Sequence, residues 1–498
     1  MNIYHLRENL LLSRNKLTLL TITLMLIFFI KGIIYSTYIV PPMMGMSADD
    51  VGHFSYIQYL ALERKLPVLH VTSLEEKPFI SFRNSRKGLF LDLELNRDFQ
   101  STDEENWIIQ HPPLYYLVMV PFYWVASNFT NSLAKVIVFL RISTVLIGIL
   151  TIFIIYKILQ NFNTNFYFNC CILLSFTFSP AIQFYFSNIT NDSLVIFLCT
   201  TVFFFLIKFF RERRYRYFFF FVLSSACVLL TKYTGALILI GYSLLFLALG
   251  IKNFGIKKTI SLCFQGIFIG IIIITPYFYH NFRLYNNLFW PGGLSPANSK
   301  ESLSFTVFLT KSGYFDELYN HICLLVGWEN LIQANYLITF YIACIIAVSV
   351  FLYSYNLSNY HVRFLLLLLY IILILLFYGY LKYKLTTAIA IGGFLLIGLC
   401  LCLSKDENKM INFLLYISIA IMLLIFTYQH YNIYSSWGYL KATHGRYYYI
   451  AFFPTTYLVF FPIKNIRIKF QQIFATILLI CQISCEFWML NQALLGLL

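Results

Sequence analysis

The stretch MSADDVGHFSYIQYLALERKLP at residues 46–67, together with QHPPLYYL at residues 110–117, bounds a polar interval in a hydrophobic chain. Eleven of the 21 Asp and Glu residues lie between residues 41 and 111. Charged side chains near lipid cost free energy, so those that a hydrophobic chain keeps there usually have a function. We therefore expect the chemistry of this protein in and around this interval.

The composition excludes a soluble globular domain, because 59% of the 498 residues are hydrophobic and 11% are charged. Apolar runs of about 17–25 residues are long enough to cross the hydrocarbon core as helices. We predict an all-α polytopic membrane protein with about thirteen transmembrane helices and interfacial helices in a large first outer loop. The candidate segments are residues 17–39, 134–159, 166–187, 192–210, 216–231, 234–250, 259–279, 333–354, 362–380, 385–403, 410–428, 446–463 and 470–490.

The net charge of +15 does not indicate nucleic-acid binding, because Lys and Arg gather in short connectors such as 211–216, 252–258 and 464–469. The positive-inside rule places these connectors in the cytoplasm. Connectors and helix count agree only if the N-terminus is cytoplasmic and residues 112–127 form an interfacial helix. The segments expected to face outward are 41–133, 188–191, 280–332 and 429–445.

Three carboxylates are candidates for the catalytic centre. Asp49 and Asp50 begin an amphipathic helix over 49–64 that we expect to lie along the membrane, where a carboxylate can act as general base beside a lipid-borne substrate. Asp192, in the tight connector SNITND, stands at membrane depth next to Asn191. For each aspartate the alternative is a helix cap alone.

Two histidines and three cations complete the candidate set. His53 and His111 are site candidates, either as metal ligands with the two aspartates or as hydrogen-bonded side chains, and metal dependence stays open. Lys232, Arg283 and Arg446 stand at the outer ends of helices, where they can bind a phosphate diester or simply anchor those ends at the interface. The acidic run at Glu75 and Glu76 we expect to be a solvated loop.

In this order the motifs resemble the polytopic GT-C glycosyltransferases, which include protein O-mannosyltransferases and lipid A aminoarabinose transferases. Asp49-Asp50 occupies the place of the acidic pair after the first helix, although Asp50 stands where Glu is usual. QHPPLYYL looks like the second interfacial helix and SNITND like the second acidic position. The remaining matches are LTKYTG at 230–235, NFRLYNNLFWP at 281–291 as a loose match, and GRY at 445–447.

The resemblance implies transfer of a sugar from a polyprenyl-phosphate carrier to an envelope acceptor (lipid, glycan or protein) at the outer face of a bacterial inner membrane. By the same resemblance Asp49 is the base or acceptor-orienting carboxylate, with Asp50 beside it and Asp192 helping to position the centre. Lys232, Arg283 and Arg446 hold the donor phosphate. The resemblance covers residues 1–290, which we treat as the catalytic module with its loop at 41–133. Residues 291–498 supply a further outer loop and C-terminal helices.

Three other functions can explain a polytopic chain. A transporter or lipid-linked glycan flippase predicts charged or broken helices near the midplane, whereas the helix centres here are largely uncharged. An O-antigen ligase or polymerase usually has its large outer loop late in the chain, and a membrane scaffold needs no catalytic carboxylate. The sequence names neither the sugar nor the acceptor.

Overall fold

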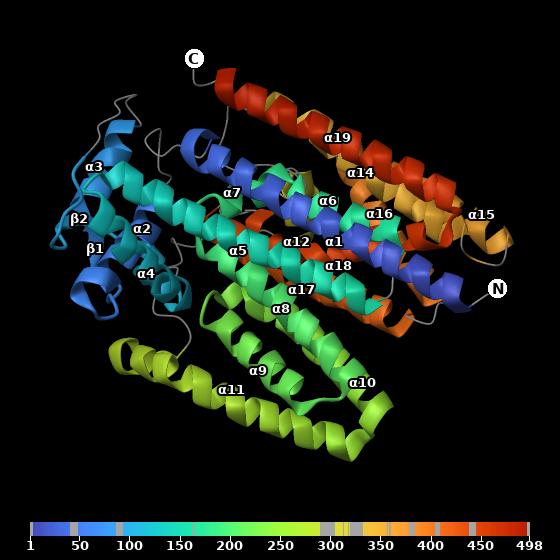
Figure 1. Ribbon diagram of the computed structural model, residues 1–498, viewed down its shortest axis with the longest axis horizontal. Coiled ribbons are helices and arrows are strands. Elements are labelled where there is room, and N and C mark those ends of the chain that lie inside the picture. The colour runs from blue at the N-terminus through green and yellow to red at the C-terminus, as the bar shows by residue number, and fades with distance from the viewer. Residues whose placement is uncertain are drawn as a thin grey trace.

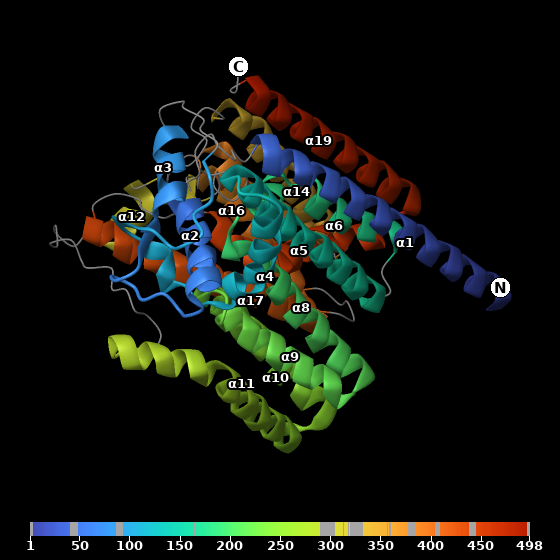
Figure 2. The same ribbon diagram turned by 60° about the vertical axis from the view of Figure 1, so that its left-hand side comes forward.

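The computed structural model describes residues 3–39, 48–85, 93–162, 165–288, 304–311, 313–316, 318, 332–355, 357, 360–376, 378, 384–403, 409–437 and 445–495. Almost all of them lie in helices that run roughly side by side (Figure 1). A smaller layer containing two short strands covers one end of the bundle, and the turned view in Figure 2 keeps that layer at the same end. We call this the loop end of the molecule.

The long helices of the N-terminal half contain the apolar runs seen in the sequence. In both halves of the described chain together, eight helices are long and apolar enough to cross a membrane, or nine if the bent pair α6–α7 is one span. The count of thirteen therefore stays a prediction. The helices of the bundle in this half are α1 (Ile3–Ile34), which continues as η1 (Tyr35–Ile39), α5 (Leu133–Phe162), α6 (Phe166–Thr177), α7 (Pro180–Phe186), α8 (Asn191–Glu212), α9 (Tyr215–Leu229), η3 (Tyr233–Gly235), α10 (Ala236–Phe254) and α11 (Ile256–Tyr285).

The C-terminal half adds helices that pack onto this bundle. The 3₁₀ helix η6 and helix α18 contact α8 and α6, and α17 lies along α10. The described elements are α12 (Phe305–Lys311), α14 (Ile332–Tyr355), α15 (Tyr360–Leu375), α16 (Leu385–Leu403), α17 (Lys409–Trp437), η6 (Gly445–Ala451), α18 (Phe452–Phe460), η7 (Phe461–Asn465) and α19 (Ile468–Leu495).

The breaks between helices follow local sequence signals. Between α6 and α7 the chain bends by 55° at Pro180, where Ser179 caps α7 by accepting a hydrogen bond from the Ile182 N–H at 3.3 Å. Between α10 and α11 the turn is made by Gly255, whose φ of +78° is a conformation that side-chain-bearing residues rarely adopt. Each break reverses or redirects the chain without leaving the bundle.

Helix α11 forms an edge of the bundle, as both views show. Large apolar side chains along its length are exposed, among them Phe264, Phe268 and Ile272. Such a face is stable only against lipid or another apolar surface. The arrangement agrees with a membrane-embedded bundle.

The layer at the loop end consists of α2 (Ala48–Glu63), β1 (Ser73–Glu75), α3 (Glu76–Ser85), β2 (Ser101–Glu105), η2 (Trp107–Gln110) and α4 (Leu114–Phe129). The strands pair antiparallel, with Ser73 opposite Glu105. Helix α2 was predicted at 49–64 and is found one residue earlier at each end.

The expectation that α2 has one buried apolar face and one exposed polar face is wrong, whereas its position along the membrane stays a prediction. Its polar residues Ser55 and Gln58 are as fully buried as Phe54 and Ile57, all at 0% exposure. The reason is tertiary, because α4, η2, α3 and β1 all pack against α2. The residues 112–127, predicted as a second interfacial helix, form α4, which lies between α2 and α5.

Candidate active site

The acidic pair of the loop is divided between two environments. Both aspartates lie in the first turn of α2; Asp50 is 3% exposed and Asp49 is half-buried. Asp50 Oδ2 is 3.6 Å from Nη2 of Arg141, a guanidinium in α5 with 0% exposure. A guanidinium remains charged at that depth only with an anionic partner. Asp50 is therefore fixed by an ion pair, and Asp49 is the more exposed member of the pair.

A second ion pair joins the starts of two other segments. Asp192, in the first turn of α8, accepts a hydrogen bond from Nζ of Lys232 at 2.6 Å, and both side chains are buried. The Thr190 hydroxyl also donates to Asp192 Oδ2 at 3.1 Å. Lys232 Nζ lies 5.2 Å from the ring centroid of Tyr447 in η6. The C-terminal half thus reaches the charged group at α8.

Tyr115 of α4 lies between the two pairs. Burial raises its pKa far above the usual range, and the charges of both Asp50 and Asp192 raise it further, so its hydroxyl stays protonated. The hydroxyl is 3.3 Å from Thr144 Oγ1 in α5. The Leu114 N–H donates to the carbonyl of Leu230 at 3.0 Å, which joins the start of α4 to the segment before Lys232. The starts of α2, α4 and α8 therefore converge on one charged cluster.

The two candidate histidines lie beside this cluster. His53, 3% exposed, has its Nδ1 2.9 Å from the Tyr116 hydroxyl. Its ring lies parallel to that of His111, which is partly exposed, at 6.4 Å between centroids and an interplanar angle of 8°. In the described part of the chain no three His, Cys, Asp or Glu residues come together in a group that can hold a metal ion. His53 is thus a buried, hydrogen-bonded histidine.

The other candidates are placed differently. Asn191 is 0% exposed and donates through Nδ2 to the Thr231 carbonyl at 3.4 Å, which places it against the Lys232 segment. Arg283 is exposed on α11, with Nη1 3.5 Å from the Tyr279 hydroxyl of the same helix. Arg446 lies in η6, but its side chain is outside the described part. The cluster thus gathers Asp49, Asp50, Asp192, Lys232 and Asn191, whereas Arg283 lies at the surface.

Sequence reasoning missed two residues of this cluster. Arg141 is a charged residue inside an apolar run, which is a signal for a site that the sequence does offer. Tyr447 follows Arg446 in the GRY motif, but nothing in the sequence indicates that its ring lies against Lys232.

The acidic run after residue 74 was predicted to be a solvated loop, and for Glu75 that is wrong. Glu75 is 0% exposed; Asn96 Nδ2 donates to its Oε1 at 2.5 Å and the Lys77 N–H to its Oε2 at 3.0 Å. Its own N–H donates to Ser55 Oγ of α2 at 3.0 Å. Burial raises the pKa of Glu75 to about 7, although both donors to its carboxylate oppose the shift. Glu75, the last residue of β1, therefore connects the β1–β2 pair to α2.

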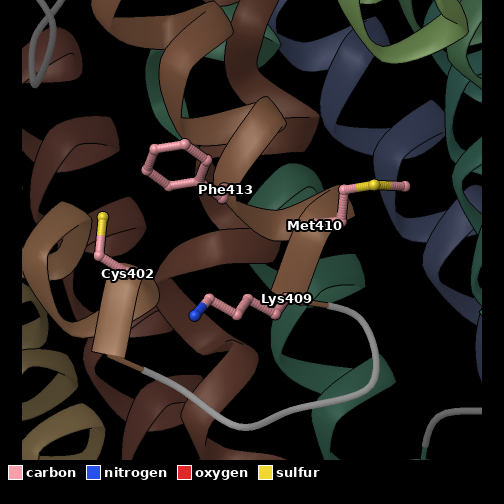
Figure 3. Close-up of a pocket in the computed structure, with 4 residues that line it drawn as sticks. All are labelled: Cys402, Lys409, Met410 and Phe413. Carbon is pink, nitrogen blue, oxygen red and sulfur yellow. The ribbon is translucent and has the colours of Figure 1, made fainter. Parts of the chain in front are cut away.

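A recess of about 480 Å³ lies elsewhere, between the end of α16 and the start of α17. Figure 3 shows its lining residues Cys402, Lys409, Met410 and Phe413. Lys409 begins α17, and His430 lies 21 residues further along this helix, or about 30 Å at 1.5 Å per residue. His430 contacts Tyr314, which contacts Tyr448 next to Tyr447 of the cluster. The recess is therefore at the far end of the bundle from the charged cluster.

Comparison with known proteins gives one family and two structures. Residues 110–280 match the family described as dolichyl-phosphate-mannose-protein mannosyltransferase. The crystal structure of ArnT from Cupriavidus metallidurans in the apo state aligns with 89% of this chain and 76% of its own, at 11% identity and a TM-score of 0.37. The structure of ArnT from the same organism bound to undecaprenyl phosphate gives 89%, 77%, 12% and 0.37. No curated protein sequence matches.

The family match confirms the resemblance over residues 110–280. This span contains Asp192, Lys232 and Arg141, but it begins after Asp49 and Asp50.

Proposed function

We propose that this chain is a membrane glycosyltransferase that moves a sugar from a polyprenyl-phosphate carrier to an acceptor of the cell envelope. The observation that supports this most directly is the cluster of Asp49, Asp50 and Asp192 with Arg141 and Lys232 at one end of an apolar bundle. The family match over 110–280 supports the reaction class. The description of that family names a dolichyl-phosphate sugar as the donor, which agrees with a polyprenyl-phosphate carrier.

In this proposal Asp49 is the general base, because it is the partly accessible carboxylate of the pair. It takes the proton of the acceptor hydroxyl or amine while the oxygen or nitrogen of that group forms a bond to the anomeric carbon of the sugar. The bond between this carbon and the phosphate oxygen breaks, and the carrier phosphate leaves with the bonding electrons. Asp50, held by Arg141, fixes the first turn of α2 and so orients Asp49.

Lys232 binds the leaving phosphate. One of its three N–H groups points to Asp192, which leaves the other two to donate to phosphate oxygens. The developing negative charge is then stabilised by an ammonium that is already fixed in position. Arg446 and Arg283 are further phosphate-binding candidates, and Arg283 requires α11 or its own side chain to turn toward the cluster.

The proposed orientation follows from the charges of the connectors. The basic connectors 211–216 and 252–258 lie between α8 and α9 and between α10 and α11, opposite the loop end. With those connectors in the cytoplasm, the N-terminus is cytoplasmic and the loop end faces the periplasm of a bacterial inner membrane.

Reconstitution tests the proposal. The purified chain in lipid nanodiscs is given labelled polyprenyl-phosphate mannose and a total envelope fraction that contains lipids, glycans and proteins, and label transfer is followed. Asp49→Asn is expected to lower the rate by a factor of about 10² to 10⁴, the usual contribution of a general base. Asp103→Asn, the same change at an exposed carboxylate of the same loop, is the control and is expected to have no effect. Unchanged transfer by Asp49→Asn removes Asp49 from the mechanism.

A transporter or flippase is the second candidate. Lys31 Nζ lies 2.8 Å from Glu486 Oε2 and donates to the Thr177 carbonyl at the α6–α7 break, so a buried charge pair does accompany a broken helix. The break follows 12 residues of α6 and precedes 7 of α7, so it lies only slightly to the loop-end side of the middle of this pair. Movement of intact carrier across sealed vesicles, without transfer of its sugar, favours this alternative.

A further inference from the structure

Tyrosines from the loop layer and from the bundle come together next to the charged cluster. Tyr56 of α2 stacks on Tyr116 of α4, with ring centroids 3.8 Å apart and an interplanar angle of 14°. Tyr56 is also close enough to Tyr233, Tyr277 and Tyr285 to interact with them electrostatically. These five phenol rings come from α2, α4, η3 and α11, and we call them the tyrosine group.

The end of α11 is fixed to the loop layer at this place. The Leu69 N–H donates to the Tyr285 hydroxyl at 2.8 Å, and Tyr233 lies 6.2 Å from Phe278, measured between ring centroids. In both views the last turns of α11 lie on the side of the molecule that holds α2 and the strands (Figures 1 and 2). The tyrosine group is therefore a built contact between three parts of the chain.

Several buried polar atoms in this contact lack hydrogen-bond partners among the residues that the structure describes. They are the Tyr233 hydroxyl, Thr234 Oγ1 and Asn281 Nδ2, and Asn281 is only 1% exposed. Tyr277 and Asn281 lie close enough to the Tyr233 hydroxyl to interact with it, but neither makes a hydrogen bond of normal distance and angle to it. Buried donors are almost always paired in folded proteins. Unpaired donors from η3 and α11 side by side therefore indicate a ligand.

The chemistry of the contact fits a sugar ring. A pyranose or furanose ring has an apolar C–H face, which packs on aromatic rings, and hydroxyl groups at its rim, which bond to hydroxyl and carboxamide groups. Tyr233 and Thr234 directly follow Lys232 in the chain, and consecutive Cα atoms are about 3.8 Å apart. In a carrier-linked donor the sugar is bonded directly to the phosphate. A phosphate at Lys232 therefore places its sugar within reach of these residues.

We propose that Tyr233, Thr234 and Asn281, at the edge of the tyrosine group, form the subsite for the donor's sugar ring. This inference rests on the proposed function, since it takes the carrier phosphate to bind at Lys232. It adds that the α9–α11 segment selects the sugar, whereas the aspartates at the start of α2 act on the acceptor.

The test compares carriers with and without a sugar. Affinities are measured in nanodiscs for undecaprenyl phosphate, undecaprenyl-phosphate mannose and undecaprenyl-phosphate arabinose. In the wild type at least one sugar-bearing carrier is expected to bind more tightly than the bare carrier. Asn281→Leu and Tyr233→Phe are each expected to weaken that binding about 3- to 10-fold, the usual effect of one hydrogen bond, and to change bare-carrier binding less than 2-fold.

Two variants guard against a loss of folding. Thr234→Val keeps the shape of the side chain and removes only its hydroxyl. Tyr242→Phe in α10 is the control, because Tyr242 is 0% exposed, packs on Phe203, and its hydroxyl also lacks a partner among the described residues. It is expected to leave all three affinities unchanged.

The outcomes separate the two proposals. Equal weakening of bare and sugar-bearing carriers, or no weakening of either, overturns the sugar subsite and leaves the carrier phosphate site standing. A wild type that binds the bare carrier as tightly as both glycosylated ones does the same. A wild type that binds no carrier overturns the proposed function and the subsite together.

Discussion

Removal of one partner from the buried pair Asp50–Arg141 is expected to destabilise the loop layer strongly. At the observed 3.6 Å, two unit charges attract by about 4–5 kcal/mol in an effective dielectric of about 20. Part of that attraction offsets the desolvation of a guanidinium with 0% exposure. Arg141→Met leaves a buried carboxylate and Asp50→Asn a buried cation. Each change is therefore expected to lower the free energy of unfolding by about 3–5 kcal/mol.

The double variant makes the prediction specific to the pair. With both charges gone no uncompensated charge stays buried, so Asp50→Asn with Arg141→Met is expected to cost less than the sum of the single changes by about 3 kcal/mol. Unfolding is titrated with SDS in mixed micelles and followed by tryptophan fluorescence. Trp124 of α4 reports on this layer, because its Nε1 donates to the Ala61 carbonyl of α2 at 3.2 Å.

The control for this cycle is Asp103→Asn, which changes an exposed carboxylate of the same layer. It is expected to shift the unfolding free energy by less than about 0.5 kcal/mol. Additive costs in the double variant refute the reasoning, since they mean that the two charges do not stabilise each other.

Three further predictions concern the other buried charges. Lys232→Met is expected to lower sugar transfer by a factor of about 10² to 10³ and to weaken binding of bare carrier phosphate; retention of both activities contradicts a phosphate site at Lys232. Glu75 has a folded pKa of about 7 against an ordinary 4.5, so its contribution is most favourable below pH 4.5 and about 3 kcal/mol of stability is lost as the pH rises through 7. Thermal unfolding at pH 5 and pH 8 measures this loss, and Glu75→Gln should show a smaller pH difference than the wild type. Glu486→Gln breaks the ion pair with Lys31 and is expected to lower stability by about 3 kcal/mol while the transfer rate at 25 °C stays unchanged; a large fall in rate with unchanged unfolding contradicts this structural role.

Part of the site was predictable because it depends on local signals. The start of α2 at Ala48, next to Asp49, and the place of Asp192 in the first turn of α8 follow from turn residues before apolar runs. Motifs far apart in the chain were assigned to one face by the charges of the connectors. Asp50, Asp192 and Lys232 do lie at the same end of the bundle.

Other parts were not predictable because they depend on neighbours that are remote in sequence. The sequence predicts that Glu75 belongs to an exposed acidic run, yet in the structure it is buried and hydrogen-bonded to Asn96 and Ser55. The charge of Arg283 and its place near a helix end predict a phosphate ligand. On α11, however, its side chain is exposed at the surface, whereas Asn281, two residues earlier, is buried.

The sequence by itself determined which segments lie in lipid and which lie in water. The length of an apolar run decides whether a helix enters lipid, and the charged residues decide which of its ends stays in water. Only the tertiary structure decided the partners: Arg141 with Asp50, Lys232 with Asp192, and the ring of Tyr447 beside that lysine. Hydrophobic burial acts on each residue separately and can be read along a chain. An ion pair or hydrogen bond acts over a few ångströms in a fixed direction, and that geometry exists only after the helices have packed.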